Sequence, residues 1–408
     1  MSELVLHNSP WRGRVEIPSS KSVAHRLLVC AALSKTPLDA IRILGTPSQD
    51  VNATKSCLDT LMAEGAPVLD CGESGTTLRF MLPVAAALGK GATFIGHGRL
   101  PERPIAPILD ALAAHGVTAT GNRLPLTIRG RLAGGEFTLP GDVSSQFISG
   151  MLLALPMTGR ASSITLSTPL ESQDYVRLTI AAMSAFGVRV SSTERGFRVE
   201  GASGYTGLKD GMTVEGDWSS AAFPMVAAAL GGDGLALANL DLESPQGDRR
   251  IVELLRTFGA RVLQEDGLVK VFPGRLAAVP EIDVRAIPDM VPALAVVAGV
   301  AAGTTRFVNA SRLRLKESDR LEATRAMITA LGGHATVEDD TLTVDGVSAY
   351  RGGRVDGVND HRIVMAAAAA AVAATGPVHI TDAEACAKSW PDFWTTRSMA
   401  TNEEVKTA

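Results

Sequence analysis

The chain is poor in aromatic residues, carries no excess of positive charge, and has no long apolar run. Aromatic residues make up 4% of 408 residues and the formal net charge is -4, which argues against a nucleic-acid-binding protein. The N-terminus lacks the basic and apolar regions of a signal peptide. The most apolar run, IVMAAAAAAVAA (363–374), is too short to span a bilayer. We therefore expect a cytoplasmic protein with no membrane or nucleic-acid partner.

Cysteine is also scarce, and its spacing suits neither a metal site nor a disulfide framework. Cys30, Cys57, Cys71 and Cys386 form no CxxC pair, and no histidine lies at zinc-ligand spacing from them. We predict four buried free thiols and no metal site. Because 408 residues exceed one typical core, the length predicts two domains.

What the sequence does contain is a repeated unit. In six segments, short polar residues precede an Ala-rich apolar run: 17–33, 72–88, 141–155, 216–230, 286–300 and 357–372. The polar residues include Ser, Thr, Asp or Asn, which cap helix N-termini. Alternating β-like runs lie between the starts, and a second helical pattern recurs five times. Each repeat therefore predicts two helices and three or four strands, and the polar tail 395–408 is expected to fray.

Six such units predict two domains of three units each, in the α/β (α+β) class. The chain is expected to cross between them near Pro18 and again near Gly216. This predicts a discontinuous domain of residues 1–18 plus 216–408, with residues 19–215 inserted as the second domain.

Basic residues gather at or near the six predicted helix starts. A cation in the first turn of an apolar helix opposes the helix dipole, so it needs a compensating anion. Helix N-termini themselves bind anions, which strengthens the prediction of a phosphate or carboxylate site. For any one residue a surface ion pair is the alternative. The set is Lys21, Arg26, Arg79, Arg103, Lys316, Arg320, Arg362 and Lys388.

Two acids and several uncharged donors complete the candidate site. Asp289 precedes an Ala-rich helix in IPDMVPALAVV, and Glu317 lies between cations in LKESDR, so both are candidates for proton transfer. The alternatives are a helix cap for Asp289 and a salt bridge for Glu317. Uncharged donors of the kind that hold a polyhydroxylated ring are Ser144, Ser145, Gln146, Ser172 and Tyr175.

Eight motifs in order carry a resemblance that covers nearly the whole chain: PSSKSVAHR, SGTTLR, ERPI, SSQF, IPD, KESDR, NDHR and AKSWPDF. At these motifs the sequence closely resembles the 5-enolpyruvylshikimate-3-phosphate synthases, also called 3-phosphoshikimate 1-carboxyvinyltransferases. The resemblance implies a two-domain inside-out α/β barrel of six βαβαββ units, three per domain, around a pseudo-threefold axis.

The same resemblance implies transfer of the enolpyruvyl group of phosphoenolpyruvate to the 5-hydroxyl of shikimate 3-phosphate, with release of phosphate. The reaction is an addition followed by an elimination, on the shikimate pathway to chorismate and the aromatic amino acids. It implies no metal and no organic cofactor. Because the function needs no partner, we expect a monomer.

Residue roles follow from the resemblance, motif by motif. The catalytic residues would be Asp289, Glu317 and Lys21. Asp289 would be the base for the hydroxyl, Glu317 would give a proton to C3 and take it back, and Lys21 would contact both substrates and share in proton transfer. Shikimate 3-phosphate would be held by Lys21, Ser22, Arg26, Ser144, Ser145, Gln146, Ser172, Asp289 and Lys316. Phosphoenolpyruvate would be held by Lys21, Gly75, Arg103, Gln146, Arg320, Arg362 and Lys388.

Two alternatives share the scaffold. UDP-N-acetylglucosamine enolpyruvyl transferase usually carries a loop cysteine, whereas GHGRLPERP (96–104) has none. A non-catalytic anion-binding protein would be expected to lose Asp289, Glu317 or Lys21, and all three are present.

Three positions depart from the family pattern. Glu73 stands where many members have Asn, and we expect Arg79 or Arg103 to compensate its charge. Arg312 also replaces a common Asn and receives no role. The family is the target of glyphosate, which occupies the phosphoenolpyruvate site. Gly75 leaves room for it, but Phe80 stands where Pro is common, so the sequence does not predict sensitivity.

Overall fold

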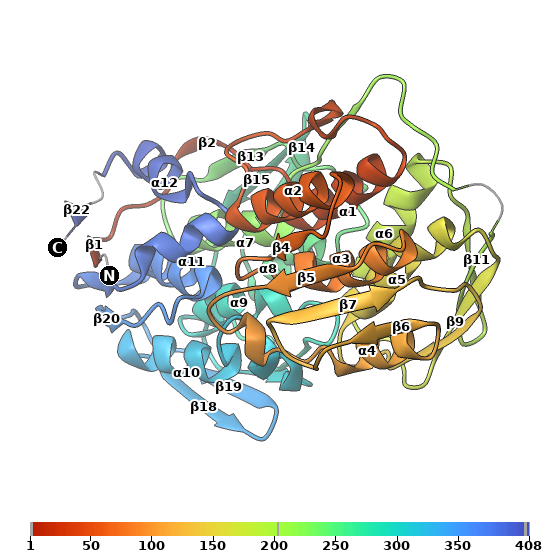
Figure 1. The fold of residues 1–408 in the computed structure, drawn as a ribbon. Coiled ribbons are helices and arrows are strands. Elements are labelled where there is room, and N and C mark those ends of the chain that lie inside the picture. The colour runs from red at the N-terminus through yellow and green to blue at the C-terminus, as the bar shows by residue number, and fades with distance from the viewer. Residues whose placement is uncertain (1–2, 202–203, 404–405, 408) are drawn as a thin grey trace. The chain divides into compact units, whose positions relative to one another are not determined.

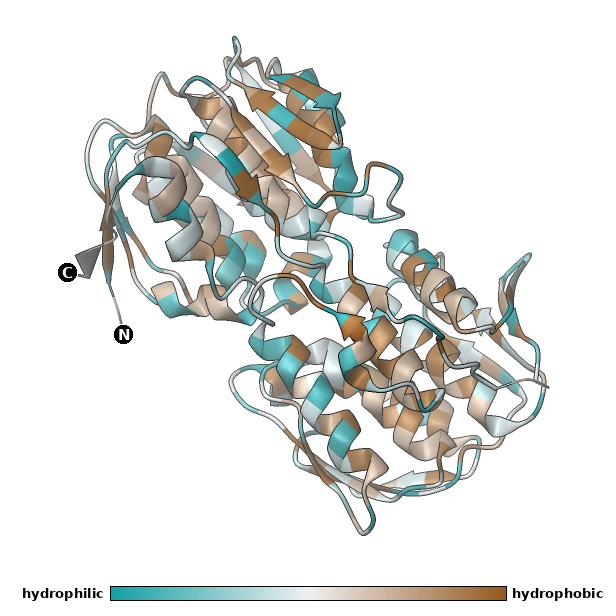
Figure 2. Cartoon of the chain, turned by 90° about the horizontal axis from the view of Figure 1, so that it is seen from above, coloured by the Kyte–Doolittle hydropathy of each residue, from teal (hydrophilic) through white to brown (hydrophobic). Residues whose placement is uncertain are grey.

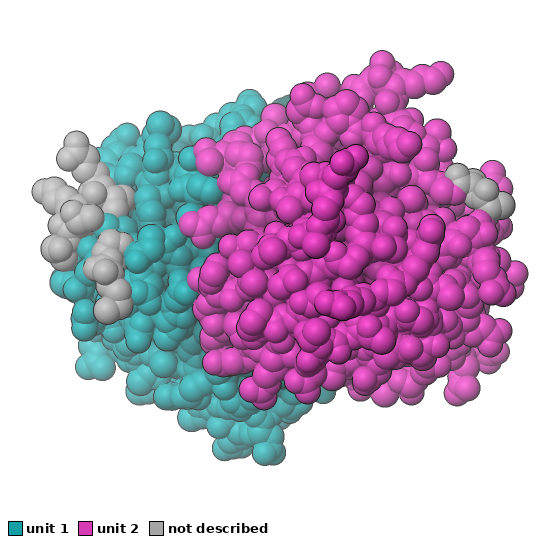
Figure 3. All heavy atoms as spheres, viewed as in Figure 1, with its two compact units in different colours: residues 1–20, 215–408 teal, residues 21–214 magenta. Residues whose placement is uncertain are grey.

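The computed structural model describes residues 3–201, 204–403 and 406–407, and the chain divides into two compact units. Unit 1 contains residues 1–20 and 215–408, and unit 2 contains residues 21–214 (Figure 3). The chain therefore leaves unit 1 directly before Lys21 and returns to it at Glu215.

Unit 2 alternates helices and short strands (Figure 1). Its helices are α1 (Lys21–Leu33), α2 (Gln49–Met62), α3 (Gly75–Ala87), α4 (Ala106–Ala113), α5 (Ser145–Ala154) and α6 (Gln173–Ala185). Its strands are β3 (Ile41–Arg42), β4 (Val68–Asp70), β5 (Ala92–Ile95), β6 (Val117–Ala119), β7 (Leu126–Gly130), β8 (Glu136–Leu139), β9 (Ser162–Leu166), β10 (Val190–Thr193), β11 (Gly196–Val199) and β12 (Met212–Thr213). Short 3-10 helices are η1 (Leu38–Ala40), η2 (Leu100–Glu102) and η3 (Leu155–Thr158).

The sheets of unit 2 repeat one topology. In the orders β4-β5-β7-β6 and β8-β9-β11-β10, the first pair is parallel and the other two pairs are antiparallel. The remaining sheet consists of β3 and β12 alone, which pair in parallel. The prediction of three or four strands in every repeat is therefore wrong for the first one, because α2 runs directly into β4 with no hairpin between them.

Unit 1 is built from the same kinds of element. Its helices are α7 (Trp218–Leu230), α8 (Ile251–Phe258), α9 (Val291–Ala298), α10 (Arg320–Ala330), α11 (His361–Ala370) and α12 (Phe393–Thr401). Its strands are β1 (Leu4–Leu6), β2 (Gly13–Glu16), β13 (Leu235–Ala238), β14 (Arg261–Glu265), β15 (Leu268–Phe272), β16 (Glu281–Asp283), β17 (Thr304–Val308), β18 (His334–Glu338), β19 (Thr341–Asp345), β20 (Gly353–Val355), β21 (Val378–Ile380) and β22 (Lys406–Thr407). Its 3-10 helices are η4 (Gly247–Arg250), η5 (Pro288–Met290), η6 (Ser311–Leu315), η7 (Ala371–Ala373) and η8 (Ala383–Lys388).

The sheets of unit 1 follow the topology of unit 2, with orders β2-β13-β15-β14, β16-β17-β19-β18 and β20-β21-β1-β22. Strand β2 lies before the first crossing and pairs in parallel with β13, which lies after the return, so that Val15 faces Leu237. Strand β1 pairs with β21 near the other end of the chain. Long-range strand pairing therefore joins the two chain segments of this unit.

Ala-rich helices form the interior of each unit. In unit 1, α7, α9 and α11 pack against one another, and in unit 2 α3 packs against α5. All residues of α9 and α11 are buried, and apart from His361 and Arg362 at the start of α11 they are all apolar. The strands cover this interior with alternating buried and exposed residues, seen in Figure 2 as brown alternating with teal. No helix in the described part of the chain is long and apolar enough to cross a membrane.

The six predicted helix starts are confirmed. Helices α1, α3, α5, α7, α9 and α11 begin at or just after them. The side chains of Ser74, Ser144, Asp217 and Asp360 accept hydrogen bonds from backbone N–H groups of the first turn. The predicted second helices also form, as α2, α4, α6, α8 and α10. The four cysteines are buried and free, as predicted.

The prediction that the polar tail frays is wrong for its first part. Helix α12 continues to Thr401, and the buried Arg397 side chain donates a hydrogen bond of 2.7 Å to Glu403. The tail looks polar in sequence because the buried residues of its described part are only Arg397, whose stem is apolar, and Ala400. Residues 404–405 and 408 of that tail lie outside the described residues.

The close packing of α3 on α5 predicts that a larger residue between the two helices will lower stability. A Cβ added at Gly150 would lie 2.3 Å from the backbone oxygen of Arg79, which belongs to the facing helix. We expect Gly150→Ala to lower the free energy of unfolding by about 1–3 kcal/mol, because the helices must separate. Urea unfolding measures this. Gly121→Ala is the control, because nothing lies within 4 Å of its added Cβ. Equal stabilities of the two variants would contradict the packing described.

Candidate active site

In unit 2, Lys21 is the first residue of α1 and is held by a carboxylate. Its Nζ lies 2.9 Å from Asp50 Oδ2, at the start of α2, and the two side chains are 13% and 12% exposed. The negative charge expected beside Lys21 is thus present in the protein itself. A small part of each side chain remains exposed to solvent.

Arg26 lies one and a half turns further along α1 and is almost entirely buried. Its guanidinium donates to Thr179 Oγ1 at 2.7 Å, to the Ser22 carbonyl at 2.6 Å, to the Tyr175 carbonyl at 2.9 Å and to Ser149 Oγ at 3.4 Å. Burial lowers the pKa of Arg26 to about 10. Since arginine has five N–H groups, these four bonds leave at most one for a substrate. Its position is therefore fixed by α1, α5 and α6.

Gln146 connects α5 with α3. Its side-chain oxygen accepts a 2.6 Å bond from Arg79, and its amide nitrogen donates a 2.7 Å bond to Thr76 Oγ1. Ser144 caps the same helix, and Ser145 is its first residue. These predicted residues therefore share one helix start, and Arg79 and Thr76 orient the Gln146 amide.

Gly75 and Arg103 are in contact. A Cβ at Gly75 would lie 2.7 Å from a terminal nitrogen of Arg103, so the guanidinium lies directly against the Gly75 α-carbon. Any side chain at position 75 would displace Arg103. The Glu73 carboxylate, in turn, lies against Gly98, whose added Cβ would be 2.5 Å from Oε2. Gly98 has φ +56°, where an L side chain is already strained.

Ser172 has a left-handed backbone, with φ 51° and ψ 47°, directly before α6. It is buried, and its carbonyl accepts a 3.2 Å bond from Tyr175 N–H. A non-glycine residue in this region is uncommon and costs about 1–3 kcal/mol, which is typical of functional positions.

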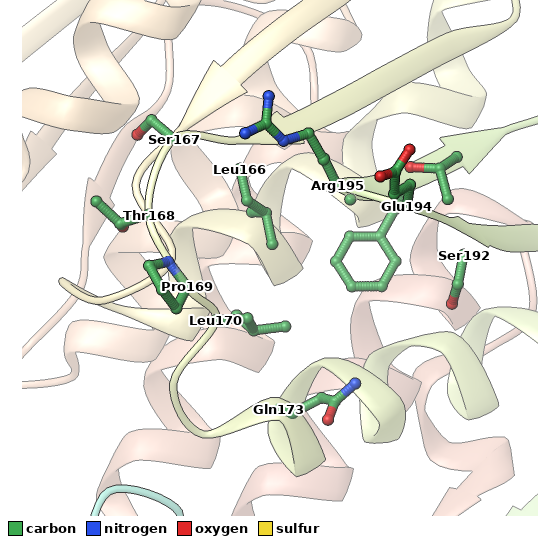
Figure 4. A pocket seen from close by; sticks show the side chains of 12 residues that line it. Leu166, Ser167, Thr168, Pro169, Leu170, Gln173, Ser192, Glu194 and Arg195 are labelled. Atoms are coloured by element: carbon green, nitrogen blue, oxygen red, sulfur yellow. The ribbon is translucent and has the colours of Figure 1, made fainter.

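A cavity of about 420 Å³ lies next to this segment, between the loop after β9 and the β10–β11 hairpin. Figure 4 shows Leu166 and Leu170 on the loop side, with Glu194 and Arg195 on the hairpin side. Of the described residues that line it, none belongs to the predicted site, although Gln173 directly follows Ser172. This cavity is thus lined by residues other than the predicted ones.

In unit 1, Asp289 of η5 is surrounded by three cations. Its Oδ1 lies 2.7 Å from Arg320 and 3.1 Å from Lys316, and its Oδ2 lies 3.1 Å from Arg362. Burial alone would raise the pKa of Asp289, but Arg362, Lys316 and Arg320 bring it well below its usual value. The alternative of a plain helix cap does not hold, since α9 has no side-chain cap.

Arg320, the first residue of α10, is shared by three carboxylates. Besides Asp289 it contacts Glu317 Oε2 at 2.6 Å and Asp360, whose Oδ2 is 3.0 Å from Nε. The Arg320 side chain is 1% exposed, and that of Asp360 is fully buried. Burial would lower the pKa of Arg320, but the three carboxylates raise it overall. Arg320 therefore fixes both predicted proton-transfer acids in one arrangement.

Two lysines complete the unit 1 group. Burial lowers the pKa of Lys316 to about 8, although Asp289 opposes this shift. Lys388, at the end of η8, donates a 2.7 Å bond to the Asn359 carbonyl and is 6% exposed. Asn359 has φ 51° and leads into α11, so Lys388 is placed beside the helix start that carries Arg362.

Several residues that sequence reasoning did not select support this arrangement. Asp50 forms an ion pair with Lys21, and Asp360 forms one with Arg320. Thr179 accepts a hydrogen bond from Arg26, whose guanidinium carbon lies 5.2 Å from the centre of the Phe80 ring. Asp360 could have been found, because it stands at a predicted helix cap in NDHR. Nothing in the sequence around Thr179 or Phe80 indicates which cation it contacts.

Comparisons with solved structures identify the fold. An EPSP synthase from Acinetobacter baumannii aligns with a TM-score of 0.80 at 24% identity, over 100% of both chains. An enolpyruvyl transferase from Streptomyces tendae aligns with a TM-score of 0.74 at 17% identity, over 100% of this chain and 99% of that one. The chain thus has the mixed α/β fold of the enolpyruvyl transferases.

Sequence comparison resolves the family within that class. The model of the family described as EPSP synthase (3-phosphoshikimate 1-carboxyvinyltransferase) matches residues 5–396. A 3-phosphoshikimate 1-carboxyvinyltransferase from Clostridium kluyveri is 39% identical, over 97% of this chain and 96% of the relative. One from Methanocorpusculum labreanum is 37% identical, over 96% of each. The chain belongs to the EPSP synthase family and is a transferase; the UDP-N-acetylglucosamine alternative is not favoured.

Because Asp360 is the fully buried partner of Arg320, the cluster makes a stability prediction. We expect Asp360→Asn to lower the free energy of unfolding by about 3 kcal/mol, since Arg320 keeps its charge and loses part of its compensation. The matched control is Asp283→Asn, which removes one partner of an exposed pair with Arg285. That change should stay within about 1 kcal/mol. Chemical unfolding that finds the two variants equally stable would contradict the buried pair.

Proposed function

We propose that this chain transfers the enolpyruvyl group of phosphoenolpyruvate to the 5-hydroxyl of shikimate 3-phosphate and releases phosphate, as a cytoplasmic monomer. The observation that carries the proposal is the cluster around Asp289, in which two acids and three cations meet. Family membership supports the choice of donor and acceptor.

The chemistry needs three proton transfers: one from the acceptor hydroxyl, one to C3 and one from C3. The acceptor hydroxyl oxygen adds to C2 of phosphoenolpyruvate and loses its proton, while C3 gains a proton and becomes a methyl group. The tetrahedral adduct then loses a proton from C3, and phosphate leaves C2 as the double bond forms again. We assign the hydroxyl proton to Asp289 and the C3 proton to Glu317. The two groups lie on opposite terminal nitrogens of Arg320.

In the ligand-free protein, Asp289 is a weak base, because three cations stabilise its ionised form. Substrate binding is expected to make Asp289 a stronger base. A phosphate or carboxylate that draws Arg362 or Lys316 toward itself removes part of that stabilisation and raises the proton affinity of Asp289. Base strength is thus expected to appear only in the occupied site.

The remaining residues would bind and orient the anionic substrates. We assign shikimate 3-phosphate to Lys21, Ser22, Arg26, Ser144, Ser145, Gln146, Ser172, Asp289 and Lys316. We assign phosphoenolpyruvate to Lys21, Gly75, Arg103, Gln146, Arg320, Arg362 and Lys388. Since Arg26 and Arg320 are largely occupied by protein acceptors, their contribution is chiefly electrostatic and positional. Lys21, with its partly open ion pair, is better placed to move onto a substrate.

Phosphate release on mixing phosphoenolpyruvate with shikimate 3-phosphate tests the proposal. We expect Asp289→Asn and Glu317→Gln each to lose at least about a hundredfold in kcat, because each removes a proton-transfer group. Matched controls are Asp283→Asn and Glu281→Gln, which change exposed acids of the same unit and should turn over like the wild type.

Two results would contradict the proposal. Wild-type protein that releases no phosphate from this pair, or releases it with UDP-N-acetylglucosamine as acceptor, would exclude the assigned reaction. Full turnover in both acid variants would remove Asp289 and Glu317 from their assigned roles while leaving the reaction itself standing.

A further inference from the structure

Unit 1 buries another carboxyl group beside the cluster, to which no role has yet been given. Asp248 lies in η4 and is 3% exposed. Its Oδ2 accepts a short hydrogen bond from Ser219 Oγ, and within the described residues Oδ1 has no hydrogen-bond partner. A buried carboxyl with one unsatisfied oxygen lowers the stability of the folded protein, so its presence here needs an explanation.

The surroundings of Asp248 connect it to the candidate site. Ser219 lies in the first turn of α7, and this helix packs against η4, against η5 with Asp289, and against α11 with Arg362. The charges of Asp289 and Arg362 both act on the Asp248 carboxyl. Asp248 is therefore an electrostatic neighbour of the proposed base and of a proposed donor-binding cation.

The other charged groups near η4 affect the Asp248 carboxyl to different extents. Asp217, at the start of α7, adds a further negative charge that acts on Asp248. Helix α8 carries Glu253 and Arg256, which are both exposed, and Arg256 donates to the Val262 carbonyl instead. On η4 itself, Arg249 donates to the Leu242 carbonyl and Arg250 is exposed. Arg362 is the cation whose charge acts on the carboxyl.

Burial raises the pKa of Asp248 to about 7, and Asp289 adds to the shift, while Arg362 and the Ser219 hydrogen bond oppose it. The group is therefore neutral below about pH 7 and ionised above it. Three predicted cations of unit 1, Lys316, Arg320 and Arg362, contact the acids Asp289, Glu317 and Asp360. Lys388 adds a fourth positive charge, beside the Asn359 carbonyl at the start of α11. An ionised Asp248 would cancel the remaining positive charge.

We propose that Asp248 is a positioning residue for the anionic donor, whose charge state sets, through Arg362, how tightly unit 1 holds phosphoenolpyruvate. The inference rests on the proposed function. While Asp248 is neutral, Arg362 offers its full charge to the donor. Once Asp248 is ionised, the two charges attract each other and the donor is held less tightly.

The experiment compares the KM for phosphoenolpyruvate of the wild type with that of Asp248→Asn between pH 5.5 and 8.5. The ratio of the two values removes the titration of the substrate itself. We expect the KM of the wild type divided by that of Asp248→Asn to rise about fivefold or more as the pH increases, with a midpoint near pH 7. The corresponding ratio of kcat values should not change with pH. Asp233→Asn, an exposed acid of the same unit, should give a flat ratio.

Ser219→Ala provides a second variant that a purely structural role would not explain. The Ser219 hydrogen bond lowers the pKa of Asp248, so its removal should move the midpoint of the KM ratio to higher pH. Far-ultraviolet spectra equal to those of the wild type, together with a single cooperative thermal transition, show that both variants fold.

Urea unfolding reads the same ionisation without any activity. Because the folded pKa of Asp248 lies above the unfolded value, its stabilising effect is complete below about pH 4 and is lost as the pH rises through 7. The urea midpoint of the wild type minus that of Asp248→Asn should therefore fall between pH 5 and pH 8.

The outcomes separate the inference from the proposed function. A falling urea difference with a flat KM ratio would show that Asp248 titrates without acting on the donor, and would overturn the inference. A flat result in both measurements would overturn it as well. Wild-type protein that releases no phosphate would overturn the proposed function and the role of Asp248 with it, whereas the urea difference would still report the ionisation.

Discussion

The buried guanidinium of Arg320 is the interaction on which the rest of unit 1 depends. It contacts Asp289, Glu317 and Asp360, which come from three different segments of the chain. A buried cation of this kind is tolerated only while its carboxylates are present, and the carboxylates are tolerated only while it is. The mutual requirement fixes η5 and the starts of α10 and α11 relative to one another.

Helix starts carry most of the candidate site because they provide both rigidity and free N–H groups. The buried Ala-rich helices bring their first turns together within each unit, and the caps Ser74, Ser144 and Asp360 satisfy backbone donors there. The longer side chains that follow can then be held in one orientation by hydrogen bonds such as that from Arg79 to Gln146. An acidic protein can thereby build local positive potential without a high net charge.

How far the sequence predicts this structure depends on whether a feature is local. The caps and Ala-rich runs are local, so the six buried helices were predicted from them. The two-stranded sheet of the first repeat could not be predicted, since β3 pairs with β12 far along the chain and no local pattern indicates that pairing. The pairing of Arg320 with Asp360 spans forty residues, and the motifs KESDR and NDHR indicate each residue but not their contact. Asp248 was missed because its burial arises only when α7 packs against η4.

We assign proton transfer to Asp289 and Glu317, which Arg320 holds in place. Incorporation of solvent deuterium into the product tests this assignment most directly. If the reaction passes through an adduct whose C3 is a methyl group, turnover in deuterated water must place deuterium on the vinyl carbon of the product. We predict deuterium at that carbon in product made by the wild type, and uptake slowed together with turnover in Glu317→Gln. Product formed in deuterated water with no deuterium at C3 would contradict the account.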